Sequence, residues 1–323
     1  MLVRGQWSQL QAPHLHGVFA QWLKLKQREE EFSHVFNMDT TDKAFIDMAE
    51  FVGVGPMVEK PEGEPSTYRD AAQGGTKRIE MYTYALGVRS SYELYEDDQY
   101  GLIKQIPKAI ARSHHFLREM STWNLINLGF ISSNSILNPV VTVDGVNLFS
   151  TAHYLPGGAS ATNIAPGVSS YISAAGTWPN RPSVDVDLSM TALQAAINNF
   201  ERMPDGVGMP MQVKPRLLVI APENKWVARE ILGSAHKPDT ADNNINSILN
   251  EDLHYFICHY FTSVGRWCLL SDKSEHSLYH ITRRPLDDMY SDDFDTYSIK
   301  MLSMSRFGVG AFHWIGTYGS DGP

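Results

Sequence analysis

The chain has 323 residues, a formal net charge of −9 and a pI near 5.7. This length suffices for about two domains, and 43% apolar residues can fill hydrophobic cores. The acidic balance argues against a nucleic-acid reader that depends on counterion release. Cys258 and Cys268 form no CxxC pair, so the sequence predicts neither a zinc site nor a disulfide framework. No apolar run approaches the roughly 20 residues of a bilayer span, and we expect a soluble, cytosolic product.

The N-terminal third predicts an amphipathic segment, a polar excursion and a strand. Residues 18–36 space apolar side chains such as Trp22 and Phe32 near helical intervals, with charges between them. Residues 52–75 are rich in glycine, proline and charge and too poor in large apolar groups to bury themselves. Ile79 and Met81 then alternate with polar residues, as in a strand. Excursion and strand together predict a projecting β-hairpin.

A long helix is expected from Asp98 to Leu128. Asp97 or Asp98 can cap its start, and Gly129 follows its end. Pro107 is expected to kink it, because proline inside a helix removes a hydrogen bond. The apolar residues recur at threes and fours: Leu102, Ile106, Ile110, Leu117, Leu125 and Leu128.

Loops and short hairpins dominate residues 131–185, with Asp144-Gly145 as a tight turn. A helix capped by Ser189 follows and stops at Pro204 to Gly206, and "RLLVI" reads as a buried strand. Pro222 opens a helix that stops at Gly233. Alternation through Ile299 and Met301 predicts a closing strand near the C-terminus.

His114 and His115 are the first candidates for chemistry. Adjacent helical residues point about 100° apart, so the two imidazoles do not converge on one metal, and only His115 and Glu119 share a face. The second histidine of an HExxH site is missing. Packing or surface roles are therefore favoured over ligand roles.

Three further patterns give weak indications. Asp287 to Asp295 packs five aspartates into nine residues but lacks the spacing of a calcium loop, so a solvated acidic turn is favoured over a cation site. "HYLPGGAS", beginning at His153, has no GxSxG elbow after it. The glycine pairs "GVGPMV" and "GVGAFHWIG" lack phosphate-loop spacing and read as turns. No catalytic, cofactor-binding or metal-binding residue is predicted, and no cofactor.

The order of several longer segments is similar to that of tailed-bacteriophage major capsid proteins of the Hong Kong 97 type. The loop "EGEPSTYRDAAQGGTKRIEMYTYALGVRSSYELYEDDQYGLI" leads into the long helix, and "DGVNLFSTAH" follows. "KPRLLVIAP", "AREILGSAHKPDTADNNIN" and "DDFDTYSIKMLSMSRFGVGAFHWIGTYGS" come next. The resemblance covers roughly 59–320, and its specificity comes from ordered co-occurrence.

The resemblance implies an α+β, Hong Kong 97-like capsid fold. In that fold, 1–56 form an N-terminal arm, 57–92 an extended β-hairpin E-loop, and 98–128 a spine helix. Residues 93–186 and 285–323 form the peripheral domain with its sheet, and 187–284 form the axial domain. The helix segment "SHHFLREMSTWN" carries bulkier residues than expected of relatives, so its packing partners are expected to differ.

The implied function is structural. The chain would assemble with itself into pentamers and hexamers of an icosahedral virion head around double-stranded DNA, without sequence-specific binding and without enzymatic activity. Scaffold, portal and decoration proteins are implied partners, no membrane is, and assembly is expected in the host cytoplasm. Some relatives join subunits by lysine-asparagine bonds, but nothing around Lys60 or Lys77 predicts a desolvated lysine. An encapsulin-type compartment shell and, less favoured, a metal-dependent hydrolase using His115, Glu119 or the aspartates are the alternatives.

Overall fold

The computed structural model describes residues 17, 19–27, 29–53, 57, 59–66, 68, 73–91, 93, 105–131, 140–155, 176–206, 209–234, 236, 245–293, 295–296 and 298–323. The chain divides into two compact units. The first unit comprises 1–46, 80–122 and 280–309, and the second comprises 47–79, 123–279 and 310–323. Neither unit is a contiguous piece of sequence, because the chain passes between them repeatedly.

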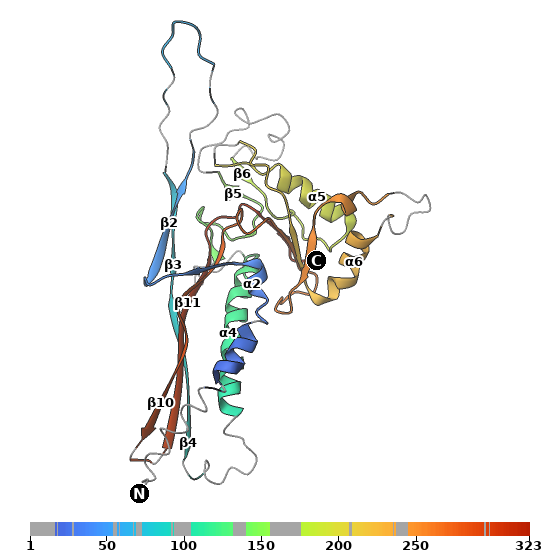
Figure 1. Ribbon diagram of the computed structural model, residues 1–323. Coiled ribbons are helices and arrows are strands. Elements are labelled where there is room, and N and C mark those ends of the chain that lie inside the picture. The colour runs from blue at the N-terminus through green and yellow to red at the C-terminus, as the bar shows by residue number, and fades with distance from the viewer. Residues whose placement is uncertain are drawn as a thin grey trace. The chain divides into compact units, whose positions relative to one another are not determined.

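A four-stranded sheet in the order β1-β10-β11-β4 is the frame of the first unit (Figure 1). Its strands are β1 (Asn37–Thr40), β10 (Leu278–Asp293), β11 (Ser298–Ala311) and β4 (Tyr82–Ser91). β11 runs antiparallel to β4, from Ser298 opposite Ser91 to Phe307 opposite Tyr82. Side chains alternate across a strand, and Met301 and Phe307 are buried whereas Lys300 and Leu302 are exposed. The predicted C-terminal strand is confirmed.

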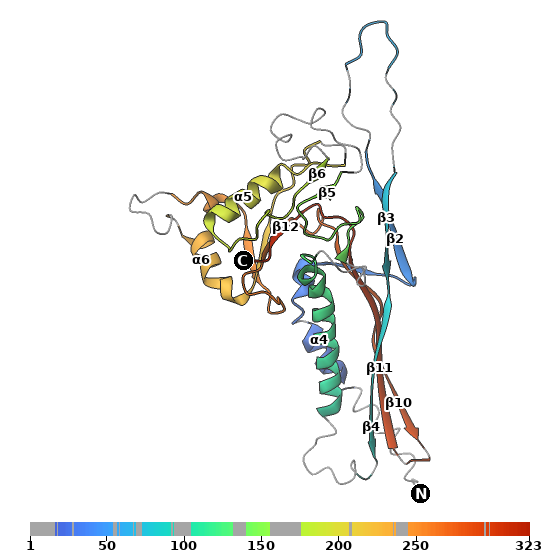
Figure 2. The ribbon, with the colours of Figure 1, turned by 180° about the vertical axis from the view of Figure 1, so that it is seen from behind.

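Helix α4 (Gln105–Asn127) lies alongside the long strands of this sheet (Figures 1 and 2). The helix ends within one residue of the predicted Leu128. The predicted start at Asp98 lies outside the described residues, and so does part of the turn before Pro107, where the kink was expected. Phe19 packs against Ile110, Ala111 and Met301, so it joins the helix to the sheet. The predicted amphipathic segment is divided: 19–27 are helical, a turn follows, and α2 (Phe32–Val35) is separate.

The predicted hairpin is a two-stranded sheet of β2 (Phe45–Phe51) and β3 (Gln73–Glu80). The sequence predicted β3 but missed β2. The side chains of β2 alternate between exposed and partly buried, so neither face of the strand is fully buried. The Glu50 side chain lies over Gly74, since a Cβ there would lie 2.5 Å from Oε2 of Glu50. β3 continues through Met81 into β4, which belongs to the other sheet.

The second unit contains a sheet in the order β12-β9-β7-β8. The strands are β12 (Thr317–Ser320), β9 (Trp267–Leu270), β7 (Leu217–Ile220) and β8 (His254–Ile257). β7 is parallel to β8 and antiparallel to β9. Strands β7 and β9 are almost wholly buried, as "RLLVI" predicted for the first of them. A two-residue pair, β5 (His153–Tyr154) and β6 (Thr177–Trp178), completes the described strands of this unit.

Helices cover this sheet and close its core. In α5 (Met190–Glu201) the Ser189 side chain accepts a hydrogen bond from the Ala192 amide at 3.2 Å, which confirms the predicted cap. The predicted Pro222 helix is a 3₁₀ turn, η3 (Pro222–Asn224), that continues into α6 (Lys225–Gly233). A second 3₁₀ turn, η4 (Ser247–Asn250), contacts α6. No helix in the described part of the chain is long and apolar enough to cross a membrane.

Candidate functional site

His114 and His115 lie on α4 and belong to the packing of the first unit. Burial, then the charges of Arg118 and His115, lower the pKa of His114 to about 3, so its imidazole is neutral. Glu119 is fully buried and accepts a hydrogen bond from the Glu31 backbone amide at 2.6 Å. Its carboxylate thus holds the segment before α2 to the helix. Among the described residues, no group of three His, Cys, Asp or Glu side chains could hold a metal.

Beside these histidines lies a buried polar cluster of Glu30, Arg118, Thr122 and His280, named here the Arg118 cluster. Arg118 forms an ion pair with Glu30, and its Nη2 lies 3.3 Å from Nε2 of His280. Thr122 Oγ1 lies 2.9 Å from Nδ1 of His280 and donates to the Arg118 carbonyl at 2.7 Å. The cluster joins three segments that are far apart in sequence, since Glu30 and His280 lie 88 and 162 positions from Arg118.

The donors and acceptors of the Arg118 cluster define the state of His280. A guanidinium only donates, so Nε2 of His280 must accept, and Nδ1 carries the proton donated to Thr122. Burial, then the charge of Arg118, hold the pKa of His280 well below its usual value. Burial raises the pKa of Glu30 and lowers that of Arg118, and their mutual attraction offsets part of this cost.

The sequence suggested a solvated acidic turn at 287–295, but the turn is confined to the end of this range. Asp287 and Asp293 belong to strand β10, which runs to Asp293, and Asp295 lies in the turn that follows. Asp287 pairs with Arg284 at 2.6 Å, and Asp293 pairs with Lys300 at 2.6 Å. The hydrogen bond from Lys300 lowers the pKa of Asp293 to about 2. These carboxylates are engaged with cations of their own sheet.

The second unit contains its own buried polar group, the Lys77 cluster of Lys77, Asp144, His153, Asn180 and Thr317. Nδ1 of His153 lies 2.7 Å from Asp144 Oδ2, and Nε2 lies 3.0 Å from Asn180 Oδ1. The Asn180 Nδ2 donates to Thr317 Oγ1 at 3.2 Å and to the Leu148 carbonyl at 2.7 Å. Both ring nitrogens of His153 therefore lie within hydrogen-bond distance of side-chain oxygen atoms.

Lys77 is desolvated, whereas the sequence analysis expected no such environment for it. Burial lowers its pKa to about 8, and the charge of Asp144 opposes this shift only in part. Its Nζ donates to the Val141 carbonyl. The sequence predicted no environment that would desolvate this lysine, because the chain that covers it begins more than sixty positions away. Lys60, on the excursion, is exposed.

The remaining motifs have structural roles where they are described. His153, the first residue of "HYLPGGAS", is part of the Lys77 cluster, while 156–160 lie outside the described residues. In "GVGPMV", the first of the two glycine pairs, Gly55 also lies outside the described residues. Gly308 and Gly310 were read as turn residues but belong to β11, where a Cβ at Gly308 would lie 2.4 Å from the Glu80 carbonyl oxygen. Close approach of backbone explains Gly308, and the Ile79 side chain lies against Gly310.

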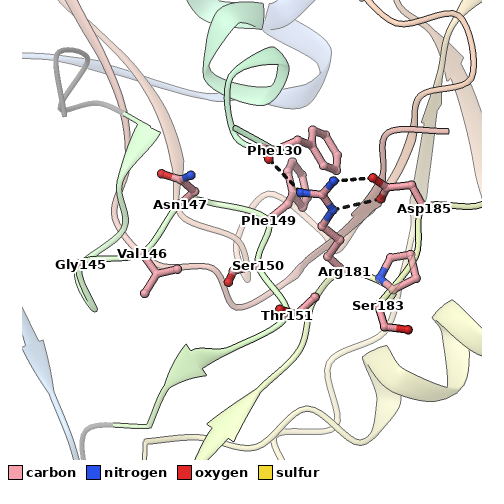
Figure 3. A pocket seen from close by; sticks show the side chains of 11 residues that line it. Phe130, Gly145, Val146, Asn147, Phe149, Ser150, Thr151, Arg181, Ser183 and Asp185 are labelled. Carbon is pink, nitrogen blue, oxygen red and sulfur yellow. Dashed lines mark hydrogen bonds and ion pairs between the residues drawn. The ribbon is translucent and has the colours of Figure 1, made fainter. Parts of the chain in front are cut away.

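A polar pocket of about 400 Å³ lies in the second unit beside Arg181 (Figure 3). Arg181 Nε donates to Asp185 Oδ1 at 3.0 Å, and Nη1 donates to the Phe130 carbonyl at 2.8 Å. The guanidinium carbon lies 5.2 Å from the centroid of the Phe130 ring, within cation–π range. The Arg181 guanidinium is thus already bonded to Asp185 and to the Phe130 carbonyl, which belong to the pocket wall. Among the described lining residues, no other cationic side chain is left to bind a ligand.

Several large apolar side chains of the described residues are exposed. On the excursion and the strand before it, Phe51, Met57 and Tyr68 are 71%, 103% and 92% exposed. Around α6 and η4 a second group is exposed: Trp226, Val227, Ile245 and Leu249. Apolar groups of this size gathered on a surface are typical of contact with another protein.

Comparison with known proteins identifies the family. A model of the phage capsid protein family matches residues 74–320. The chain belongs to the phage capsid proteins. The family match identifies a structural protein, a major capsid protein of an icosahedral shell. No curated protein matches the sequence.

Solved capsids support the fold at low sequence identity. The capsid of a native GTA particle matches with a TM-score of 0.56 and 10% identity, covering 91% of this chain and 90% of that one. A Microbacterium phage Oxtober96 chain matches with a TM-score of 0.52 and 10% identity, covering 90% of each chain. The bacteriophage JBD30 procapsid matches with a TM-score of 0.51 and 14% identity, covering 100% of this chain and 77% of that one. The predicted Hong Kong 97-like fold is confirmed.

The family assignment also ranks the alternatives. The match to phage capsid proteins favours a virion shell over an encapsulin-type compartment. The hydrolase alternative relied on His115, Glu119 or the aspartates at 287–295. Glu119 accepts the Glu31 amide, and Asp287 and Asp293 pair with cations of their own sheet. Sequence reasoning missed Arg118, Thr122 and His280, and the only available signal was a charged residue within an apolar helical stripe.

Proposed function

We propose that this capsid protein assembles into pentamers and hexamers of the icosahedral head of a tailed phage, around double-stranded DNA. Assembly takes place in the host cytoplasm with scaffold and portal proteins, and decoration proteins bind the outside of the shell. The protein acts without catalysis. The net charge of −9 supports a container that does not grip its DNA, because like charges repel across the inner surface.

Within this proposal the chain segments have separate tasks. Residues 1–56 act as the N-terminal arm, and 57–92 act as the E-loop that lies over a neighbouring subunit. The spine helix is 98–128, within a peripheral domain of 93–186 and 285–323. The axial domain, 187–284, meets its copies at the capsomer centre. Contacts of this head-to-tail kind are heterologous and close into rings.

The exposure of Met57 and Tyr68 carries the proposal. Both side chains are more than nine-tenths exposed, and they stand on a segment otherwise rich in charge, glycine and proline. Such a segment lacks the apolar groups to build a core of its own. A neighbouring subunit that covers these two side chains would supply the missing half, and burial of each would contribute about 1.5–3 kcal/mol.

Negative-stain electron microscopy with sedimentation tests the proposal. The chain is expressed alone and together with its neighbouring genes, and closed shells, rings or tubes are expected. Met57→Asp should abolish these assemblies, because a carboxylate cannot be buried in an apolar contact without a partner. Glu62→Gln, on the same excursion, is the matched control and should assemble normally.

Circular dichroism of both variants separates misfolding from loss of assembly. A folded Met57→Asp subunit that remains small in sedimentation supports the proposal. Subunits of the natural sequence that stay monomeric or dimeric under both expression conditions would contradict it, as would normal shells from Met57→Asp.

A further inference from the structure

The hairpin of β2 and β3, whose strands lie side by side in Figures 1 and 2, is joined at its base to the rest of the second unit. That rest, residues 123–279 and 310–323, is named here the body. Nε2 of His313 in the body lies 2.9 Å from Oε1 of Glu50 on β2, and both side chains are 11% exposed. His313 lies 263 positions from Glu50 and follows β11. The contact therefore connects the hairpin to a distant part of the chain within one compact unit.

The other ring nitrogen of His313 shows which atom carries the proton. Nδ1 accepts a hydrogen bond from the Ile315 backbone amide at 3.1 Å, because an amide nitrogen can only donate. Nε2 therefore carries the ring proton and donates it to Glu50. A hydrogen bond to an ionised carboxylate is roughly twice as strong as one between neutral groups. The imidazole is thus held from both sides, by its own segment and by the hairpin.

Gly74 on β3 leaves room for this contact. The Glu50 carboxylate lies over it, and a Cβ at position 74 would stand 2.5 Å from Oε2 of Glu50. A side chain at 74 would have to push this flexible carboxylate aside, and the hydrogen bond to His313 would be lost with it. The glycine therefore serves the contact between β2 and the body.

Strand β3 is attached to the same body at two further places. A Cβ at Gly75 would lie 2.7 Å from the Val143 carbonyl oxygen, so the strand lies directly against the backbone of the body. The Val143 amide donates to the Phe312 carbonyl at 2.9 Å. Lys77, which is 9% exposed, donates from Nζ to the Val141 carbonyl. Both strands of the hairpin are therefore fixed at the base.

The excursion beyond the base is exposed. Val52, 6% exposed, is the last buried residue before it, and the described residues that follow, 57, 59–66 and 68, are all exposed. An exposed segment takes its direction from the strands that carry it. In the part of the chain that the structure describes, the direction of the excursion is thus set where the hairpin meets the body.

We propose that Glu50 and His313 are positioning residues that aim the excursion at the neighbouring subunit. The inference rests on the proposed function, in which that neighbour covers Met57 and Tyr68. A small rotation at the base of an arm moves its tip a long way, so the contact at the tip depends on the contact at the base. Holding the arm in its bound direction before association also lowers the entropy cost of ordering it.

Distances between two spin labels test the proposal on subunits kept too dilute to assemble. Labels at Gln73→Cys on β3 and Asn198→Cys on α5, both exposed positions, report the direction of the hairpin relative to the body. Cys258 and Cys268 are fully buried and should not be labelled. With no further substitution, a narrow distribution of distances is expected.

Glu50→Ala and His313→Leu should each broaden this distribution by roughly a factor of two or more, because each removes the contact between β2 and the body. Glu50→Gln should keep it narrow, since the amide oxygen still accepts the Nε2 proton. Asp47→Ala is the matched control, because it removes an ion pair of 2.7 Å to Arg78, between β2 and β3, and should leave the width unchanged.

A second label pair, Asn198→Cys with Arg229→Cys on α6, lies wholly within the body and should give the same distribution in every variant. Its broadening in Glu50→Ala would show that the contact supports the whole unit, and the positioning role would be wrong. An unchanged width for the Gln73 pair in both Glu50→Ala and His313→Leu would also overturn the proposal. So would a distribution that is already broad in the natural sequence.

Assembly is scored separately, by sedimentation at increasing subunit concentration. Glu50→Ala should need a concentration roughly tenfold higher than the natural sequence to assemble, and Glu50→Gln should not. A loosened hairpin with unchanged assembly would mean that the two residues do not aim the excursion for a neighbour. Failure of the natural sequence to assemble would instead contradict the proposed function, and the label distances would still report on the base of the hairpin.

Discussion

The Nη2 atom of Arg118 lies 3.3 Å from Nε2 of His280, so a buried guanidinium donates to a buried imidazole. The arrangement requires a neutral His280, because an imidazolium would place two positive charges in contact. Glu30 supplies the compensating charge from the N-terminal segment. The packing of this segment onto α4 thus depends on the protonation state of a histidine near the start of β10.

Acidification should destabilise the first unit from about pH 6.5 downward. The pKa values of His280 and His114 are lowered in the folded state, so the unfolded chain takes up protons first and stability is lost as the pH falls below the unfolded value. Each histidine contributes up to about 1.4 kcal/mol per pH unit in this window. Urea unfolding at pH 7.5 and pH 5.5 measures the loss.

The variant His280→Gln is the control for this pH dependence. Glutamine keeps a donor and an acceptor but does not titrate, so the difference between the two pH values should shrink. The raised pKa of Glu30 acts in the opposite sense, since the folded state takes up this proton first as the pH falls towards 4.5, and the gain is complete below that value. An unchanged pH dependence in His280→Gln would refute the role of this histidine.

Removal of Arg118 from its buried ion pair with Glu30 should lower the free energy of unfolding far more than removal of one partner from an exposed ion pair. Arg118→Met leaves the Glu30 carboxylate buried without its partner, and we expect a loss of about 3–5 kcal/mol in the free energy of unfolding. Arg284→Met breaks an exposed pair with Asp287 and should cost about 0–1 kcal/mol. Equal losses from chemical denaturation of the two variants would argue against a buried pair.

Alkaline conditions should stabilise the second unit through Lys77. Its pKa of about 8 lies below the unfolded value, so stability should rise as the pH increases from about 8 towards 10. Since a tenfold change in proton affinity corresponds to roughly 1.4 kcal/mol, the rise is at most about 3 kcal/mol. The Lys77→Met variant should lack it. Thermal unfolding of both proteins across this range decides, and a parallel rise in Lys77→Met would show that other groups cause it.

Replacement of Asn180 by aspartate, which has the same shape but carries a charge, should lower the free energy of unfolding. Its Nδ2 donates to Leu148 and Thr317, and its Oδ1 accepts from the Ser150 amide at 2.8 Å. Asn180→Asp replaces the donor with a second acceptor in a buried site, and a loss above about 2 kcal/mol is expected. Asn224→Asp is the matched control, because that side chain makes one long bond of 3.4 Å near the surface. Similar losses for both variants, measured in urea, would contradict the assignment.

Local signals in the sequence predicted several elements well. Ser189 caps α5 because a serine side chain satisfies an amide of the first helical turn, which is an interaction within three residues. The alternation around Met301 predicted β11, and the apolar run ending at Ile220 predicted β7, for the same local reason. The order of these segments also supported the resemblance to capsid proteins, which the family match confirmed.

The sequence by itself therefore determined most of the helices and strands and the family, since periodicity and capping act over a few residues. Only the tertiary structure decided that β2 pairs with β3, that Asp287 lies on a strand, and that Lys77 is buried. The Arg118 cluster is of this second kind. Its partners lie up to 162 positions from Arg118, and no short-range pattern specifies which distant segment covers a given side chain. Burial and hydrogen-bond pairing depend on which distant segments pack together, so they appear only once the fold is complete.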